Sequence, residues 1–266
     1  MTDNNWQLMP GVFMKSMFNL GAKLGIVSSA IIGSAIVGTL SAIAMPQEKI
    51  VQKLGPVPVF TITDAKGAPL VASNSDNDKQ GGVAGVFINQ RDAEAFVNQL
   101  KTKNPELAKS VRVVPVSLGE VYKLDQSTAN KPNALDFAYV PAKQQVDAAM
   151  AILKKAGQDE KKFQGTPLFV AKAGKEKGYL TVKQANQQVI PFFFNQEELQ
   201  TMLERFKKQQ PDLASTVEIQ VVNLEGVIET MKSRNDNQLD QIMLVPPKES
   251  IDFVRSLQPA AQPRKK

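Results

Sequence analysis

The 266-residue sequence predicts an α+β protein built from two tandem homologous units, which we expect to be related by a pseudo-two-fold axis. Three observations support this prediction. A long segment repeats within the chain, each copy combines β-rich runs with amphipathic helices, and charged or glycine-containing loops separate these elements. The strands are expected to be short and mostly antiparallel. The chain is long enough for one large domain or two modest ones.

The internal repeat defines the two units. Residues 86–121 align with residues 192–227 without a gap. Identical residues stand at matching positions: Phe87 and Phe193, Asn89 and Asn195, Pro105 and Pro211, and Leu118 and Leu224. Similar residues on both sides of this block extend the first unit to 55–156 and the second to 163–257. The connector between them is charged and contains glycine, as is typical of a linker.

Each unit is predicted to open with strands. In the first unit, residues 57–72 form a hairpin about a turn at Asp64–Gly67. A polar loop then precedes a third, apolar strand at residues 83–88. Asn89 stands where a helix N-cap is expected, and Asp92 follows three residues later. These features predict a helix that begins directly after Asn89.

The predicted helix carries an apolar stripe with the i, i+3, i+4, i+7 spacing of one helical face. The stripe consists of Ala93, Phe96, Val97 and Leu100 in the first unit, and of Leu199, Met202, Leu203 and Phe206 in the second. Pro105 and Pro211 end these helices. The remaining elements are a strand (111–116, 217–222), a short helix from Ser117 or Asn223, a last strand (136–140, 242–245) and a final helix from Pro141 or Pro246. The sequence leaves open the strand order and whether the units share one sheet.

Residues 1–44 are predicted to be a signal peptide. The uncharged stretch 24–44 follows two lysines and ends in small residues, so cleavage is expected between Ala44 and Met45. The alternative is a retained membrane anchor, because about 20 residues can span a bilayer. The many Gly, Ala, Ser and Thr residues in the stretch favour removal over anchoring. Cleavage would leave a mature form that does not span a membrane.

Composition excludes several classes of function. The sequence contains no Cys and no His, which rules out disulfides, thiol catalysis, Ser-His-Asp triads and the commonest transition-metal ligand. The formal charge of +6, from 32 basic and 26 acidic residues, is too small and too scattered to indicate nucleic-acid binding. Residues 258–266 include the short basic run at the C-terminus and are expected to be a disordered basic tail.

Short polar motifs favour structural roles over chemistry. Gly81–Gly85 is glycine-rich but lacks the Lys-Ser/Thr of a phosphate loop, and Asp76–Asp78 lacks the further oxygen ligands of a calcium loop. Asp147 and Asp252 recur early in the predicted final helices, where a carboxylate interacts favourably with the helix dipole. No catalytic residue, metal ligand or cofactor is therefore predicted.

After these exclusions, the sequence still supports binding through an apolar surface. Residues 189–194 form the most apolar predicted strand, and alternation divides its side chains between two faces. One face covers the helix stripe, and the other is either the contact between the units or an exposed groove. The groove would bind a client polypeptide. The candidate client-binding residues are Val86, Ile88, Phe192, Phe194, Phe60 and Phe169.

Several segments, taken together and in order, resemble one known family. They are GPVPVFTITDAKGAPLV, VFINQRDAEAFV, VRVVPVSLGEVYKL, LDFAYVP, GTPLFVAK, VIPFFF, QQPDLASTVEIQVV and LVPPKESIDFV. This pattern is similar to the twenty-two-kilodalton Tic family of the chloroplast inner-envelope translocon, and within it to the cyanobacterial, periplasmic branch. The resemblance covers about residues 54–258, nearly all of the expected mature chain.

The resemblance implies a non-enzymatic helper of protein transport, located in the periplasm or the thylakoid lumen. Its expected partners are unfolded outer-membrane β-barrel precursors and the barrel-assembly machinery, and its expected contacts are apolar pockets. A second hypothesis is an exported hydrolase or small-ligand-binding protein that uses carboxylates. As a hydrolase it would need two carboxyl groups about 5–9 Å apart across a pocket. A third hypothesis is a membrane-surface protein held by its N-terminal segment.

Overall fold

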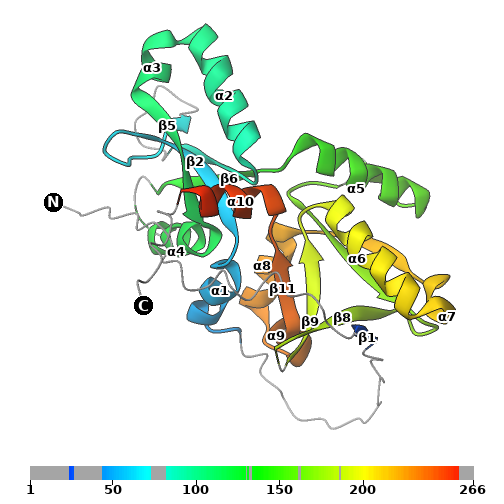
Figure 1. Cartoon of the computed structure of the whole chain (residues 1–266). Coiled ribbons are helices and arrows are strands. Elements are labelled where there is room, and N and C mark those ends of the chain that lie inside the picture. Colours follow the sequence, from blue (N-terminus) through cyan, green and yellow to red (C-terminus); the bar gives the residue numbers. More distant parts are fainter. Residues whose placement is uncertain are drawn as a thin grey trace, which may run out of the picture.

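The computed structural model describes residues 24–26 and 44–257, except for residues 73–81, 130, 132–133, 161–162 and 186. These residues form two sheets with helices between and outside them (Figure 1). The strands are β1 (Leu24–Ile26), β2 (Pro58–Asp64), β3 (Val71–Ala72), β4 (Val83–Phe87), β5 (Val111–Ser117), β6 (Asp136–Val140), β7 (Pro167–Ala173), β8 (Gly178–Gln184), β9 (Gln187–Phe193), β10 (Glu218–Asn223) and β11 (Ile242–Val245). The helices are α1 (Gln47–Leu54), α2 (Gln90–Lys103), α3 (Pro105–Ser110), α4 (Leu118–Thr128), α5 (Lys143–Lys155), α6 (Gln196–Gln209), α7 (Pro211–Ala214), α8 (Leu224–Ser233), α9 (Asn237–Gln241) and α10 (Lys248–Ser256).

Side-chain caps fix where several helices begin. Asn89 accepts a hydrogen bond from the backbone N–H of Asp92 at 2.8 Å, so the predicted N-cap of α2 is confirmed. Ser117 caps α4 and Asn223 caps α8 in the same way. Pro105 both follows the end of α2 and opens α3, because a proline without an N–H suits the first turn of a helix.

Four strands of each sheet are paired in the same way. β2 pairs antiparallel with β4 and β5, while β4 pairs parallel with β6. In the second sheet β7 pairs antiparallel with β9 and β10, while β9 pairs parallel with β11. Phe60 lies opposite Phe87 in the first sheet, and Phe169 lies opposite Phe193 in the second. The predicted mixture of helices and mostly antiparallel strands is confirmed, whereas common origin and a two-fold axis stay predictions.

One hydrophobic cluster joins the inner faces of both sheets. It contains side chains of β2 and β4 in the first sheet and of β7 and β9 in the second, together with α1, α4 and α8. Leu118 of α4 and Leu224 of α8 are fully buried in it. Ile50 and Leu54 of α1 are also buried there, although α1 precedes the predicted start of the first unit. The chain therefore has two sheets but one shared core.

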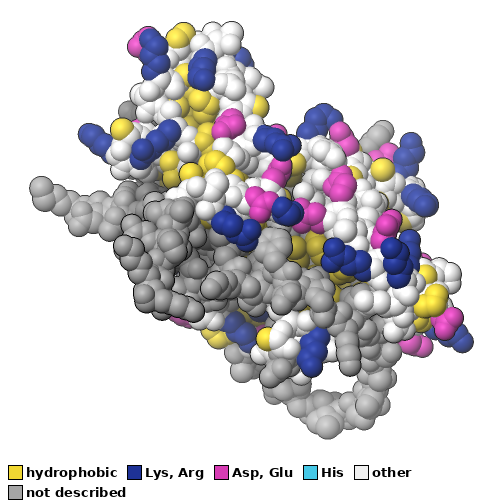
Figure 2. All heavy atoms as spheres, in the orientation of Figure 1, with side chains coloured by type: hydrophobic (Ala, Val, Ile, Leu, Met, Phe, Trp, Pro, Cys, Tyr) yellow, Lys and Arg dark blue, Asp and Glu magenta, His cyan; other side chains and the backbone are white. Residues whose placement is uncertain are grey.

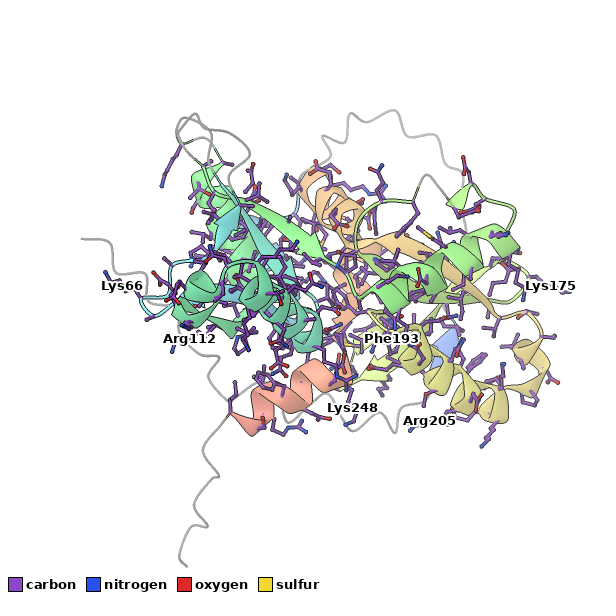
Figure 3. The ribbon with its side chains drawn as sticks, turned by 90° about the horizontal axis from the view of Figure 1, so that it is seen from above. Lys66, Arg112, Lys175, Phe193, Arg205 and Lys248 are labelled. Carbon is purple, nitrogen blue, oxygen red and sulfur yellow. The ribbon has the colours of Figure 1, made fainter. Side chains whose placement is uncertain are left out.

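The last helix of each half covers the sheet of the other half. α5 contacts β7 and β10 of the second sheet, and α10 contacts β2 of the first. Figure 3 shows α10 running from Lys248, near the middle of the molecule, out along the first half. The buried hydroxyl of Ser250 on α10 donates to the carbonyl of Ile88 at 3.3 Å. On α5, the buried amide of Gln145 accepts from the backbone N–H of Gln196 at 2.9 Å.

Candidate client-binding surface

The six residues predicted to bind a client lie in the core. Their exposed fractions are 0% for Val86, 4% for Ile88, 4% for Phe192, 2% for Phe194, 0% for Phe60 and 0% for Phe169. The first four belong to the cluster that joins the inner faces of the two sheets. Phe60 and Phe169 lie on the opposite, outer faces, under helices. The structure therefore corrects their placement, because they do not line an exposed groove.

The predicted cleavage point lies next to a well-anchored residue. Ala44 is exposed, whereas the side chain of Met45 is buried in the shared core. The backbone N–H of Met45 donates to the carbonyl of Met231, near the end of α8, at 3.1 Å. Apart from Leu24–Ile26 and Ala44, the predicted signal peptide lies outside the described residues, as does the predicted basic tail at 258–266.

The outer face of the second sheet is sealed. Leu199, Met202, Leu203 and Phe206 of α6 are all at most 6% exposed, so the predicted stripe is entirely buried. Ala149 of α5 is fully buried in the same cluster, and further α5 side chains pack against it. Figure 1 shows α5 and α6 lying side by side over this sheet. Two helices together thus exclude water from this face.

The outer face of the first sheet is only partly covered. Ala93 of α2 is fully buried, but Phe96 on the same stripe is 43% exposed and Val97 is half-buried. The reason is the length of the neighbouring helix, because α10 has 9 residues and α5 has 13. In the sequence, Pro259 follows the last residue of α10 by three positions, and proline is common shortly after a helix ends because it lacks an N–H.

Apolar side chains therefore reach the surface between α2 and α10. We define the first-sheet patch as Leu70, Phe96, Val97, Val113, Phe253 and Leu257. Phe96 packs on Phe87 with ring centroids 5.7 Å apart, and Phe253 packs on Phe60 at the same separation. Leu257 is 49% exposed and follows Phe253 by one helical turn. Figure 2 shows hydrophobic side chains at the surface of this part of the molecule, over α2 and β5.

Polar contacts close the patch at one end. Arg91 at the start of α2 forms an ion pair of 3.2 Å with Glu249 at the start of α10. Glu198 of α6 accepts a hydrogen bond from the backbone N–H of Lys248 at 2.8 Å and so caps α10. Burial raises the pKa of Glu198, although hydrogen bonds from Lys248 and Asn195 oppose this rise. The starts of α2 and α10 are thus held together, and their far ends leave the apolar surface open.

The surface offers apolar contact without reactive groups among its six residues. Within the described part of the chain, no group of three or more acidic, His or Cys residues could hold a metal ion. Asp147 pairs with Lys143 and Asp252 pairs with Lys248, and the side chains of both ion pairs reach solvent. Gly82–Gly85 lies at the start of β4, while Gly81 and Asp76–Asp78 are outside the described residues. Among the described helices, none has the length and hydropathy needed to cross a membrane.

Sequence reasoning missed this patch because both stripes have equally apolar residues. The pattern Ala93, Phe96, Val97 and Leu100 reads as a buried face, and its exposure follows only from which helix lies beside it. The available signal was Pro259, which follows α10 closely in the sequence and has no counterpart near the end of α5. Using that signal required knowing that α10 covers the first sheet.

Comparison with known proteins gives consistent matches. A sequence model of the Tic22-like family matches residues 9–256. Protein TIC 22-like, chloroplastic, of Arabidopsis thaliana is 28% identical over 204 residues, which are 75% of this chain and 61% of that protein. Protein TIC 22, chloroplastic, of Pisum sativum is 24% identical over 207 residues, which are 77% of this chain and 75% of that protein. The chain thus spans less than two thirds of the length of the Arabidopsis relative.

Solved structures share the fold. Anabaena Tic22, described as a protein-transport protein, matches with a TM-score of 0.71 and 33% identity, covering 82% of this chain and 100% of that one. Tic22 from Plasmodium falciparum matches with a TM-score of 0.61 and 21% identity, covering 78% and 96% respectively, and supports the fold alone. The family resemblance predicted from the ordered sequence segments is confirmed.

Proposed function

Because the chain belongs to the Tic22-like family, we propose that it is a non-enzymatic protein-transport factor that binds unfolded precursors through the first-sheet patch. The observation that carries this proposal is the unequal cover of the two sheets. An apolar face that is sealed in one half reaches solvent in the other, where Phe96 and Leu257 are 43% and 49% exposed. Exposed apolar patches of this kind mark contacts with other proteins.

The patch suits a client that presents apolar side chains. Its rings and aliphatic side chains can exclude water from such a segment without needing a fixed pattern of hydrogen bonds. The sheet and helix beneath it are anchored in the fold, since Phe60, Phe87 and Ala93 are buried. The client would therefore gain contact area while the carrier loses little conformational freedom.

We place this activity in the periplasm or the thylakoid lumen, with cleavage between Ala44 and Met45 on the way. The clients that we propose are unfolded outer-membrane β-barrel proteins, which expose many apolar residues before they insert. The carrier would release them to the barrel-assembly machinery. N-terminal sequencing of the protein recovered from cells tests the cleavage, and a first residue other than Met45 would contradict it.

An aggregation assay tests client binding. The full chain, added to a β-barrel protein diluted from urea, should delay the rise in light scattering. The double variant Phe96→Ser, Leu257→Ser should need about a tenfold higher concentration for the same delay, because it loses apolar contacts worth about 1–2 kcal/mol. Gln99→Ser is the matched control, because Gln99 is exposed and polar on the same helix. No delay by the unaltered chain, or equal delay by the patch variant, would refute the proposal.

A further inference from the structure

The outer edge of the second sheet differs from that of the first. β3, at the edge of the first sheet, has 2 residues, both exposed. β8, which occupies the corresponding place beside β7 and β9, has 7 residues. Very short edge strands offer little backbone for unwanted pairing, whereas a long edge strand presents a row of N–H and C=O groups to another chain. The edge of β8 is thus the one of the two that can pair with a further strand.

An extended segment of the same chain already lies on this edge. β1 pairs antiparallel with β8, placing Leu24 opposite Val182, Gly25 opposite Thr181 and Ile26 opposite Leu180. Leu180 and Val182 are each 1% exposed and belong to the core of the second half. The register therefore sets apolar residues of the added strand opposite apolar residues of β8, with a small residue between them.

We propose that the outer edge of β8 is a strand-acceptor site for an extended polypeptide that carries apolar residues at alternate positions. Leu24–Ile26 lies within the segment that we expect to be removed, so in the precursor it fills the site and in the mature chain it leaves the site open. Main-chain hydrogen bonds would supply affinity, and side chains opposite Leu180 and Val182 would supply selectivity.

The alternation of the accepted strand indicates its source. Transmembrane β-strands alternate apolar and polar residues, and their unfolded precursors contain many such segments. The biological client of this strand-acceptor site rests on the proposed transport function. The strand-acceptor site is the backbone edge of β8 in the second sheet, whereas the first-sheet patch is an apolar surface on the first sheet. The two sites can therefore be tested separately.

Hydrogen exchange of the β8 amides tests the proposal directly. The full chain is compared with a chain that begins at Met45. Every buried hydrophobic side chain of the described residues lies between Met45 and Val254, so the shorter chain keeps the whole described core, and its urea unfolding is measured as a check. We expect exchange within residues 178–184 to be about tenfold faster in the shorter chain, the effect of losing one or two net backbone hydrogen bonds.

Peptides then probe the open edge. A peptide with the sequence of residues 20–30 and an alternating Val-Thr peptide of equal length should both restore slow exchange in the shorter chain. The same 20–30 peptide with Pro in place of Gly25 should not, because proline lacks an N–H and does not fit a paired strand. Equal exchange in the two chains, or protection by the proline peptide alone or by none, would overturn the proposal.

The result is independent of the patch. Protection of β8 in the Phe96→Ser, Leu257→Ser variant should equal that in the unaltered chain. If the aggregation assay fails while the peptides still protect β8, the strand-acceptor site stands and the proposed client role falls. If the peptides fail while aggregation is delayed, the proposed function stands and this inference falls.

Discussion

Replacing one phenylalanine on α2 and one on α6 tests whether the outer faces of the two sheets are unequally covered. Phe206 of α6 is fully buried, and its truncation to Ala should cost about 3–5 kcal/mol of unfolding free energy, since a closed core cannot refill the space. Phe96 of α2 is 43% exposed. Phe96→Ala removes only the buried part of the ring from apolar contact and leaves no closed cavity. The expected loss of unfolding free energy is therefore about 1–2 kcal/mol.

Urea unfolding followed by far-ultraviolet circular dichroism measures both values, and the midpoint shift multiplied by the slope gives each loss. Phe206→Ala is expected to be the more destabilising change by about 2–3 kcal/mol. Equal losses for Phe96→Ala and Phe206→Ala would show that α2 is as well covered as α6. The first-sheet patch would then not be an open surface.

The shared core, two glycines with positive φ and one half-buried carboxylate can each be tested by unfolding in urea. Because one core joins both sheets, urea should unfold residues 44–257 in a single transition, and two separated transitions would contradict the shared core. Gly165→Ala should destabilise more than Gly157→Ala in the same assay. Both glycines have positive φ, which costs an alanine about 1–2 kcal/mol, but at Gly165 the new Cβ would also displace the Glu225 carboxylate, which accepts hydrogen bonds from the backbone N–H of Thr166. Equal losses would refute that contact. Burial raises the pKa of Glu198, so the stabilising contribution of this side chain is full below the ordinary glutamate pKa and is lost as the pH rises through the raised value. Glu198→Gln should therefore raise the urea midpoint at about pH 7 and leave it unchanged at about pH 4. A lower midpoint at neutral pH would contradict this sign.

Local signals in the sequence predicted much of the fold. Asn89 caps α2 because its short side chain reaches an N–H three residues on, a relation that depends only on nearby residues. The strands and amphipathic helices followed from residue periodicity in the same way. α1 escaped prediction because it lies before the repeat, although Ile50 is buried in the shared core.

The candidate site depended on contacts between distant parts of the chain. The sequence correctly placed Phe192 on an apolar strand, but it could not tell a face that packs in the core from a face that meets solvent. Phe96 has the spacing of a core residue and is exposed because α10 is short and comes from the other half. Periodicity identifies apolar faces, and only the tertiary arrangement decides which of them are covered.

Site-specific photocrosslinking tests the central claim most directly. A benzophenone side chain is placed at Phe96 on α2 or, as the matched control, at the exposed Glu204 on α6, and each protein is irradiated with an unfolded outer-membrane β-barrel protein. Binding through the first-sheet patch predicts a strong crosslink from position 96 and little or none from position 204. Equal crosslinking from both positions, or crosslinking from position 204 alone, would contradict it.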